Sequence, residues 1–315
     1  MKKTLVLFVL LALWQYGWPT AADPQTLKRI KIGYPSLSFR KSNVWIARET
    51  GIFNKYGLEV EPILFRGGQV ATQALVSGDP PIVNIGTVVQ ATIQGHNIVL
   101  VAAVENKYDF IIFTRPGITQ SHYASIILAR HLNAELKEFT LLPAGLDPER
   151  IAAVNSGYVD ATFLATSAAP LARKAGLSEL VQVGDLGVEV QGNGFATSSA
   201  YIAANRDVVM SALKGFVEAI YFVYANKKEA QRVFAKYMRT NDPNVLEDSY
   251  NGYIKSIPKK PYPTLKGIQF MLDVLAPQLP KAKNFKPEQF VDLSFLKELE
   301  KEGFFNEMAK RYPTK

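Results

Sequence analysis

The residues best suited to binding chemistry surround the ends of predicted strands. One group lies at the start of a predicted helix, where Arg66, Gly67 and Gly68 are adjacent, and a second, Gly86-Thr87, follows an apolar strand at residues 82–85. Backbone amides at a helix N-terminus bind anions, and glycine lets a ligand approach the main chain closely. An arginine adds a charged donor. This spacing predicts a site for a small anionic or polar molecule.

A second stretch of the chain repeats this design. Gly145 precedes a predicted helix, Ser156-Gly157 ends that helix as Ser77-Gly78 ends the earlier one, and an apolar strand leads to Thr166-Ser167. The repetition predicts two α/β lobes, each with small residues at strand ends, where open α/β sheets bind ligands. Any α/β protein repeats helix, glycine and strand, so a coincidental similarity stays open.

Other candidates lie in two further places. One group follows the first predicted strand, at residues 30–33, and Gln191 precedes a predicted return strand. A polar loop after the first strand offers hydroxyls and amides, although a solvated turn is the alternative. Trp45 has a ring that could line a pocket, but core packing explains it better. The candidate ligand-binding residues are Ser36, Leu37, Ser38, Arg66, Gly67, Gly68, Gly86, Thr87, Gly145, Thr166, Ser167 and Gln191.

No residue pattern predicts catalysis or metal binding. The chain has no cysteine, which excludes disulfides, thiolate metal sites and a cysteine nucleophile. His96, His122 and His131 lack metal-ligand spacing, although His122 begins a predicted helix and could reach a ligand. The sequence contains no G-x-S-x-G, P-loop or H-E-x-x-H motif. We therefore expect no catalytic residue, no metal and no cofactor.

Residues 1–22 have the pattern of a cleavable secretory signal. Lys2-Lys3 precede an apolar run at residues 5–13, and small residues come before Asp23. A retained anchor is the alternative, because residues 14–18 are rich in aromatic side chains. No later segment is expected to reach membrane-spanning length. The mature chain is therefore predicted to be soluble and periplasmic or extracytoplasmic.

The charge balance of the chain is basic. Its 315 residues include 36 Lys and Arg and 28 Asp and Glu, a formal net charge of +8, to which the two leader lysines contribute. A positive surplus attracts an anionic ligand or an acidic membrane surface. The basic residues are scattered without interleaved aromatic residues, so no nucleic acid partner is expected.

The order of predicted elements indicates two lobes joined by two crossings. We assign residues 23–114 plus 196–315 to the first lobe, whose C-terminal part from residue 208 reads as consecutive amphipathic helices, and residues 115–195 to the second. Residues 110–114 and 195–204 are predicted to be the crossing strands. A hinge of two strands would let the lobes close over a ligand.

Five sequence motifs match one known family. They are Tyr34-Pro-Ser-Leu-Ser-Phe, Trp45-Ile-Ala-Arg-Glu-Thr-Gly-Ile-Phe-Asn-Lys-Tyr-Gly-Leu-Glu-Val, Arg66-Gly-Gly, Ala74-Leu-Val-Ser-Gly-Asp and Lys259-Lys-Pro-Tyr-Pro-Thr. Together they resemble the nitrate, sulfonate, taurine and thiamine-precursor branch of ABC-transporter substrate-binding proteins. The resemblance covers nearly all of the mature chain. It implies a type II periplasmic-binding-protein fold, in which a monomer clamps one small molecule and presents it to ABC permease subunits in the membrane.

The chain departs from this family near Gln120. Relatives place a linker, a strand and a Gly/Ser-rich loop between the equivalents of Gln120 and Ser121, whereas here residues 116–120 lead directly into a predicted helix. The second lobe is therefore expected to lack its first strand, which would expose a sheet edge and remove backbone donors. A segment missing for reasons unrelated to biology is the alternative.

The leading functional hypothesis is capture of a small molecule without catalysis. The positive charge favours an anion such as a sulfonate, nitrate or carboxylate, although a neutral pyrimidine stays open. One alternative is an enzyme resembling thiamine-pyrimidine synthases, against which the missing cysteines and the export signal argue. Another is a ligand-free binding-protein remnant that acts through a partner.

Overall fold

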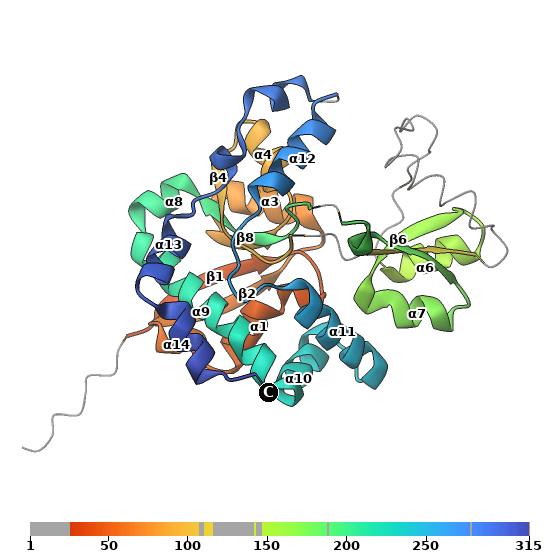
Figure 1. Ribbon diagram of the computed structural model, residues 1–315, viewed down its shortest axis with the longest axis horizontal. Helices are drawn as coiled ribbons and strands as arrows, with labels where there is room; N and C mark the ends of the chain where they lie inside the picture. Colours follow the sequence, from red (N-terminus) through yellow and green to blue (C-terminus); the bar gives the residue numbers. More distant parts are fainter. Residues whose placement is uncertain are drawn as a thin grey trace, which may run out of the picture.

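The structure, a computed structural model, describes residues 26–106, 110–115, 142, 147–187, 189–277 and 279–314. Within these residues the chain forms two α/β lobes, one built on a five-stranded sheet and the other on a three-stranded sheet. Figure 1 shows the smaller lobe beside the larger one, which carries most of the helices. The α/β class predicted from the sequence is confirmed.

The larger sheet has the strand order β2-β1-β3-β8-β4. Strand β1 is parallel to β2 and β3, whereas β8 is antiparallel to both β3 and β4. Parallel strands need helical crossovers that cover both faces of a sheet, and β3 and β4 are accordingly buried along their whole length. The strands are β1 (Lys28–Tyr34), β2 (Leu58–Leu64), β3 (Ile82–Ile85), β4 (Ile98–Ala103) and β8 (Gly194–Ser198).

The helices of the larger lobe pack on both faces of this sheet. The ring of Phe216 on α9 lies 4.6 Å from the ring of Phe195 on β8, and Trp45 stacks on Tyr237 at 5.0 Å. Trp45 is fully buried, which confirms core packing. These helices are η1 (Phe39–Lys41), α1 (Ser42–Glu49), α2 (Ile52–Lys55), α3 (Gly68–Ser77), α4 (Val88–Ile93), α8 (Ser199–Ala204), α9 (Arg206–Ala225), α10 (Lys227–Met238), α11 (Pro243–Ser256), α12 (Leu265–Leu275), η5 (Pro280–Asn284), η6 (Pro287–Phe290), α13 (Ser294–Lys301) and α14 (Phe304–Arg311).

Helix α9 is the one described helix that is long and apolar enough to cross a membrane. This corrects the expectation that no segment after the leader has that length and composition. Two thirds of its most apolar window, 67%, is buried inside the protein. Its apolar side chains pack on the sheet and on α1, α2 and α10, so α9 is a core helix.

The smaller sheet has the order β6-β5-β7, and β5 is antiparallel to both neighbours. Phe113, Val154 and Leu164 are fully buried at its core. The described elements of this lobe are β5 (Phe110–Thr114), α6 (Asp147–Asn155), β6 (Ala161–Ala165), η3 (Thr166–Ala168), α7 (Ala169–Lys174), β7 (Ser178–Gln182) and η4 (Val183–Leu186).

Strand β5 corrects the boundary between the lobes. The sequence places residues 110–114 at the end of the first lobe as a crossing strand, but β5 is the central strand of the second sheet. The chain leaves the larger lobe after β4 and returns before β8, so β5 is not itself a crossing. An apolar run fits the centre of either sheet equally well, and only strand pairing decides between them. The region around Gln120, where a strand is predicted to be missing, lies outside the described residues.

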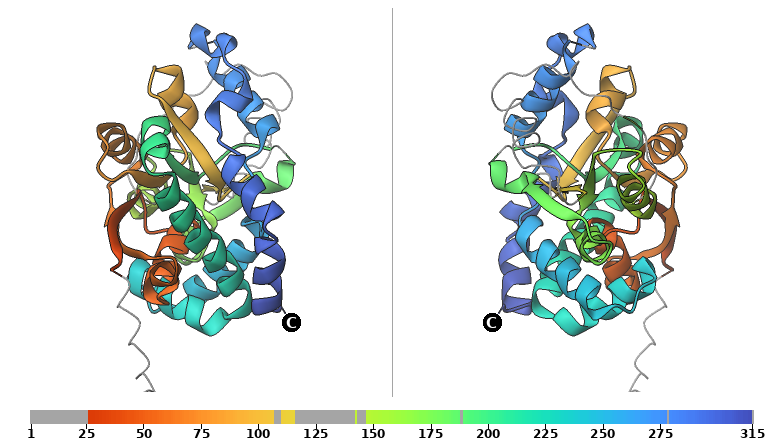
Figure 2. Two further views of the ribbon diagram at one scale, coloured as in Figure 1. Left: turned by 90° about the vertical axis from the view of Figure 1, so that its left-hand side faces the viewer. Right: turned by 90° about the vertical axis from the view of Figure 1, so that its right-hand side faces the viewer.

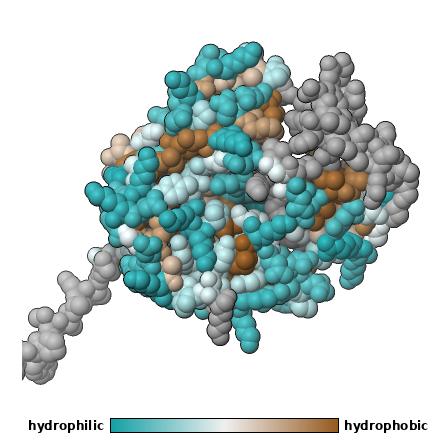
Figure 3. Space-filling view, in the orientation of Figure 1, coloured by the Kyte–Doolittle hydropathy of each residue, from teal (hydrophilic) through white to brown (hydrophobic). Residues whose placement is uncertain are grey.

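The C-terminal helices lie along the side of the larger lobe. Figure 2 shows this segment in dark blue, and α14 contacts α9. Helices α13 and α14 each bury one apolar face, and the buried side chains include Phe295, Leu299 and Phe305. The opposite faces are polar, and the surface over them in Figure 3 is predominantly hydrophilic.

Candidate functional site

The candidate site lies at the edge of the larger sheet where three parallel strands end. Strands β1, β2 and β3 run in the same direction, so the loops at residues 35–38, 65–67 and 86–87 meet at one edge. The start of β8 pairs with the end of β3, as Gly194 opposes Ile85, so the returning chain enters at the same edge. We call this edge the junction. Residues 104–106 form the first crossing segment and residues 189–193 the second.

Several predicted residues are brought together at the junction. The Gly67 amide donates to the Pro35 carbonyl at 3.2 Å, which joins the loop after β1 to the start of α3. A Cβ added to Gly68 would lie 3.5 Å from the Thr87 side chain. The Gly67 backbone has a φ of 103°, a left-handed conformation that favours glycine. The structure thus places the Gly-Gly pair, Thr87 and the polar loop within one small region.

The polar loop itself has partly structural roles. The Ser38 side chain accepts from the Arg40 amide at 3.5 Å and caps η1, while Leu37 packs against the main core. Ser36 is partly exposed, and Arg66 is exposed. Ser36 and Arg66 therefore keep the most freedom to meet a ligand.

Gly86 and Gln191 connect the junction to the second crossing segment. A Cβ on Gly86 would lie 3.5 Å from the Asn193 side-chain oxygen. Gln191 is 1% exposed, and its Oε1 accepts from the Thr264 amide at 2.9 Å. Its Nε2 has no hydrogen-bond partner among the described residues. Gln191 therefore anchors the start of α12 and retains one buried donor.

On the smaller lobe, Thr166 is partly exposed at the end of β6, in η3, and Ser167 follows it in the same turn. Element η3 contacts α11 of the larger lobe, and α11 in turn contacts η1, which follows the loop at residues 35–38. Asp147 begins α6, and burial raises the pKa of its carboxyl, while Arg150 and then Arg40 of the larger lobe act to lower it. The charge of Arg40 therefore reaches across the junction. Gly145, His122 and His131 lie outside the described residues.

The floor of the junction is a buried charged cluster that the sequence did not reveal. Arg40 pairs with Glu105 through Nε and Oε1 at 2.9 Å, and both side chains are almost fully buried. Lys41 Nζ donates to the Asn84 carbonyl at 3.1 Å, to Asn84 Oδ1 at 3.4 Å and to Asn193 Oδ1. Asn193 Nδ2 in turn donates to Glu105 at 2.8 Å. We call these five residues the hinge network.

Burial dominates the electrostatics of Lys41. Its desolvated ammonium loses hydration, which lowers its pKa to about 7, while Glu105 acts to raise the pKa and Arg40 to lower it further. The adjacent basic pair at residues 40–41, directly after a polar loop, was the available signal in the sequence. Nothing local could show that these side chains turn inward to meet residues far along the chain.

A second set of contacts braces the crossing segments from outside. The Ala103 amide donates to the Pro261 carbonyl at 2.7 Å, and Asn106 Nδ2 donates to the Tyr262 carbonyl at 3.0 Å. Thr264 Oγ1 donates to Glu189 at 2.8 Å. The Lys-Lys-Pro-Tyr-Pro-Thr motif therefore holds the segment before α12 against both crossings.

A substitution at Gly267 tests the packing of α12 against the second crossing segment. A Cβ at residue 267 would lie 2.7 Å from the Gln191 amide nitrogen and 2.8 Å from the Val190 carbonyl carbon, which are backbone atoms with little freedom to move. We expect Gly267→Ala to lower the free energy of unfolding by about 1–3 kcal/mol, as overpacking does elsewhere. Chemical denaturation measures the change. Gly68→Ala is the control, because its Cβ would make ordinary contact, and equal losses in both variants would contradict the close packing.

Two ion pairs join the lobes at α11. Arg173 lies 3.5 Å from Asp248 of α11, and Lys255 of α11 lies 3.3 Å from Asp185. All four side chains are exposed to solvent, so each pair contributes little to stability. These two ion pairs can therefore form and break at low cost.

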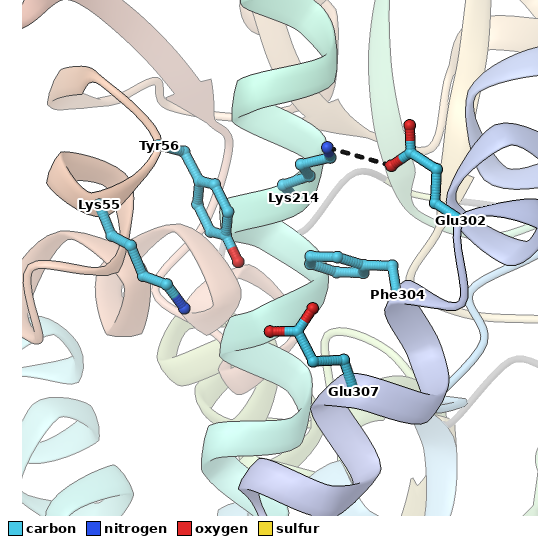
Figure 4. A pocket seen from close by; sticks show the side chains of 6 residues that line it. All are labelled: Lys55, Tyr56, Lys214, Glu302, Phe304 and Glu307. Carbon is cyan, nitrogen blue, oxygen red and sulfur yellow. Dashed lines mark ion pairs between the residues drawn. The ribbon is translucent and has the colours of Figure 1, made fainter.

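A cavity of about 230 Å³ lies away from the junction, on the larger lobe. Figure 4 shows its lining from α2, α9 and the C-terminal helices, with the Lys214–Glu302 pair at 3.2 Å. The lining residues are Lys55, Tyr56, Lys214, Glu302, Phe304 and Glu307. Among the described residues, no group of three His, Cys, Asp or Glu side chains could hold a metal ion.

The fold is that of periplasmic substrate-binding proteins, with two α/β lobes and two crossings. No family model matches the amino-acid sequence. No curated protein is similar to it in sequence. The similarity lies in the three-dimensional structure, and the structural neighbours include binding proteins of ABC importers.

Three solved structures illustrate this similarity. The periplasmic aliphatic sulphonate binding protein SsuA from Escherichia coli is 19% identical with a TM-score of 0.66, and the alignment covers 85% of this chain and 99% of SsuA. The ligand-binding component of an ABC-type import system from Staphylococcus aureus, with zinc bound, is 15% identical with a TM-score of 0.69, covering 86% and 98%. The periplasmic nitrate-binding protein NrtA from Synechocystis PCC 6803 is 12% identical with a TM-score of 0.63, covering 91% and 89%.

One neighbour is an enzyme. The desulfurization enzyme DszB is 13% identical with a TM-score of 0.60, and the alignment covers 87% of this chain and 99% of DszB. The fold therefore occurs with catalysis as well as with binding, although most of the neighbours named here are binding proteins.

Proposed function

We propose that this chain is an extracytoplasmic solute-binding protein, which captures a small molecule between its lobes and delivers it to an ABC permease as a monomer. The observation that supports this most is the junction: polar loops from three parallel strands meet where two crossing segments join the lobes. A molecule held there would contact both lobes, and closing them would exclude water. The secretory pattern of residues 1–22 agrees with a periplasmic location.

We infer that the ligand is a small anion such as a sulfonate, nitrate or carboxylate. The amides at the start of α3 provide donors, and the exposed Arg66 provides charge. The Thr87 hydroxyl already donates to Thr72 Oγ1, because the Thr72 hydroxyl itself donates to the Gly68 carbonyl at 2.8 Å. The charges of Arg40 and Lys41 are directed to Glu105 and to the asparagines of the hinge network. Recognition would therefore depend on main-chain amides and Arg66 more than on buried cations. A neutral pyrimidine is the competing ligand.

A thermal-shift panel tests this function on protein lacking residues 1–22. A ligand that binds only the folded state stabilises it by about 2.7 kcal/mol at a concentration of 100 times Kd, so one anion of the panel should raise the Tm. Arg66→Ala should weaken its binding about tenfold, the loss expected for one charged hydrogen bond. Arg48→Ala, an exposed arginine on α1, is the matched control.

Each outcome of the panel separates the competing functions. A Tm unchanged by sulfonates, nitrate, carboxylates and pyrimidines would contradict ligand capture and favour the remnant that acts through a partner. A pyrimidine that alone raises the Tm would contradict the anion assignment. A ligand that is consumed during incubation would favour an enzyme, as the similarity to DszB allows.

A further inference from the structure

The two crossing segments are tied to each other by main-chain and side-chain bonds. The Val104 amide donates to the Asn193 carbonyl at 2.8 Å, and the Gly192 amide donates to the Glu105 carbonyl at 2.9 Å. A Cβ on Gly192 would lie 2.7 Å from Glu105 Oε2, so a side chain at residue 192 would displace the Glu105 carboxylate. Any bending between the lobes must therefore move the two segments together.

Lys41 ties this pair of segments to the larger lobe. Its ammonium has three N–H donors, and three acceptors surround it, two on Asn84 at the end of β3 and one on Asn193 of the second crossing segment. Asn84 Nδ2 also donates to the Arg40 carbonyl at 3.0 Å, which fixes the loop that carries Lys41. The side chain is 2% exposed, so water does not replace these bonds.

We propose that Lys41 is a positioning residue whose proton sets the resting angle between the lobes, by holding Asn193 and the crossing segments against the sheet edge that receives the ligand. This inference rests on the proposed capture of a ligand by lobe closure. A charged Lys41 satisfies all three acceptors, whereas a neutral amine has two donors and leaves one acceptor without a partner. Losing the proton therefore loosens the tie between the larger lobe and the second crossing segment.

The surroundings of Lys41 place this change near neutral pH. Arg40 from its own loop and Glu105 from the first crossing segment are the charged groups that act on it among the described residues, and β3 and the second crossing segment contribute the neutral Asn84 and Asn193. Burial lowers the pKa of Lys41 to about 7. The tie is consequently intact at pH 6 and weakened at pH 8.

Interlobe distance as a function of pH tests the proposal directly. The chain has no native cysteine, so Lys174→Cys on α7 and Lys228→Cys on α10, both exposed, allow two fluorophores to be attached for energy transfer. Without ligand, the transfer efficiency should change between pH 6 and 8 with a midpoint near 7. Lys41→Met should abolish this transition, and Lys41→Arg, which stays charged, should hold the low-pH value. Lys31→Met, an exposed lysine paired with Asp79, is the control.

A second measurement keeps the test valid if a Lys41 variant folds poorly. The folded-state pKa near 7 lies below the ordinary lysine value, so from pH 7 to 9 the unfolded chain holds a proton that the folded chain has released. The ratio of folded to unfolded protein then rises with pH, by up to tenfold for each pH unit. The wild-type protein should show this rise, and Lys41→Arg should not. A transition that survives in Lys41→Met, or a wild-type protein with neither effect, would overturn the proposal.

Both measurements are made without ligand, so they are independent of the panel that tests capture. A pH-dependent lobe angle with no ligand in the panel would leave the positioning role standing and remove the proposed function. If a ligand of the panel binds but the lobe angle does not depend on pH, the proposed function stands and the positioning role of Lys41 is removed.

Discussion

Replacing Glu105 by leucine is expected to lower the free energy of unfolding by about 3–5 kcal/mol, because the buried Arg40 and Lys41 would lose the carboxylate that balances them. Glu105 is 1% exposed, so water cannot take its place. Asn193 Nδ2 would lose its acceptor as well. Urea denaturation of the leaderless protein measures this change.

Two further variants separate charge from packing at this position. Glu105→Gln keeps the shape and can still accept from Asn193, but it removes the ion pair with Arg40. Its free energy of unfolding should therefore fall, by less than that of Glu105→Leu. Glu302→Gln removes a partner from the exposed pair with Lys214 and should change stability by about 1 kcal/mol or less. If Glu105→Gln were as stable as the wild-type protein, the buried ion pair would contribute nothing.

The second large effect is expected at Glu218, in the middle of α9. This carboxylate is 1% exposed and accepts from Lys55 Nζ at 2.8 Å, Tyr312 OH at 2.7 Å, Arg311 Nη1 at 3.2 Å and the Tyr56 hydroxyl. Glu218→Leu would leave these donors without a common acceptor. We expect a loss of about 3 kcal/mol, the lower end of the range for a broken buried pair, because Lys55 and Arg311 can partly reach solvent.

Amide hydrogen exchange locates this effect. Glu218 joins the end of α14 to α2 and α9, so Glu218→Leu should reduce protection in residues 304–312 more than in β1 or β3. Glu229→Gln, in an exposed pair with Arg232 on α10, is the control and should leave the exchange of α14 unchanged. Uniform loss of protection across both lobes would contradict a local stabilising role of Glu218 at the C-terminus.

Much of the larger lobe could be predicted from local patterns. Alternating and continuous apolar runs predicted the strands at residues 30–33, 58–64 and 82–85, each within three residues of the observed bounds. Glycines at residues 67 and 78 have positive φ, so the turn signals were correct. The periplasmic-binding-protein fold implied by the family motifs is confirmed by the structural neighbours.

The candidate ligand residues stay predictions, but their placement has a clear physical basis. Residues that follow parallel strands must lie at one sheet edge, so the sequence could place Ser36, Gly68 and Thr87 together. It could not show that Ser38 caps η1 or that Gln191 anchors α12. Such roles depend on hydrogen bonds to particular neighbours, which a hydrophobic pattern does not encode.

The sequence by itself determined the fold class, the first-lobe strands and the polar loops at their ends, because these follow from short-range periodicity and turn chemistry. Only the tertiary structure decided that β5 belongs to the second sheet and that Lys41 meets Asn193, 152 residues away. The physical reason is that strand pairing and the burial of charge are set by contacts between distant segments. A lysine in a polar loop looks solvated until the fold surrounds it with Asn84, Glu105 and Asn193.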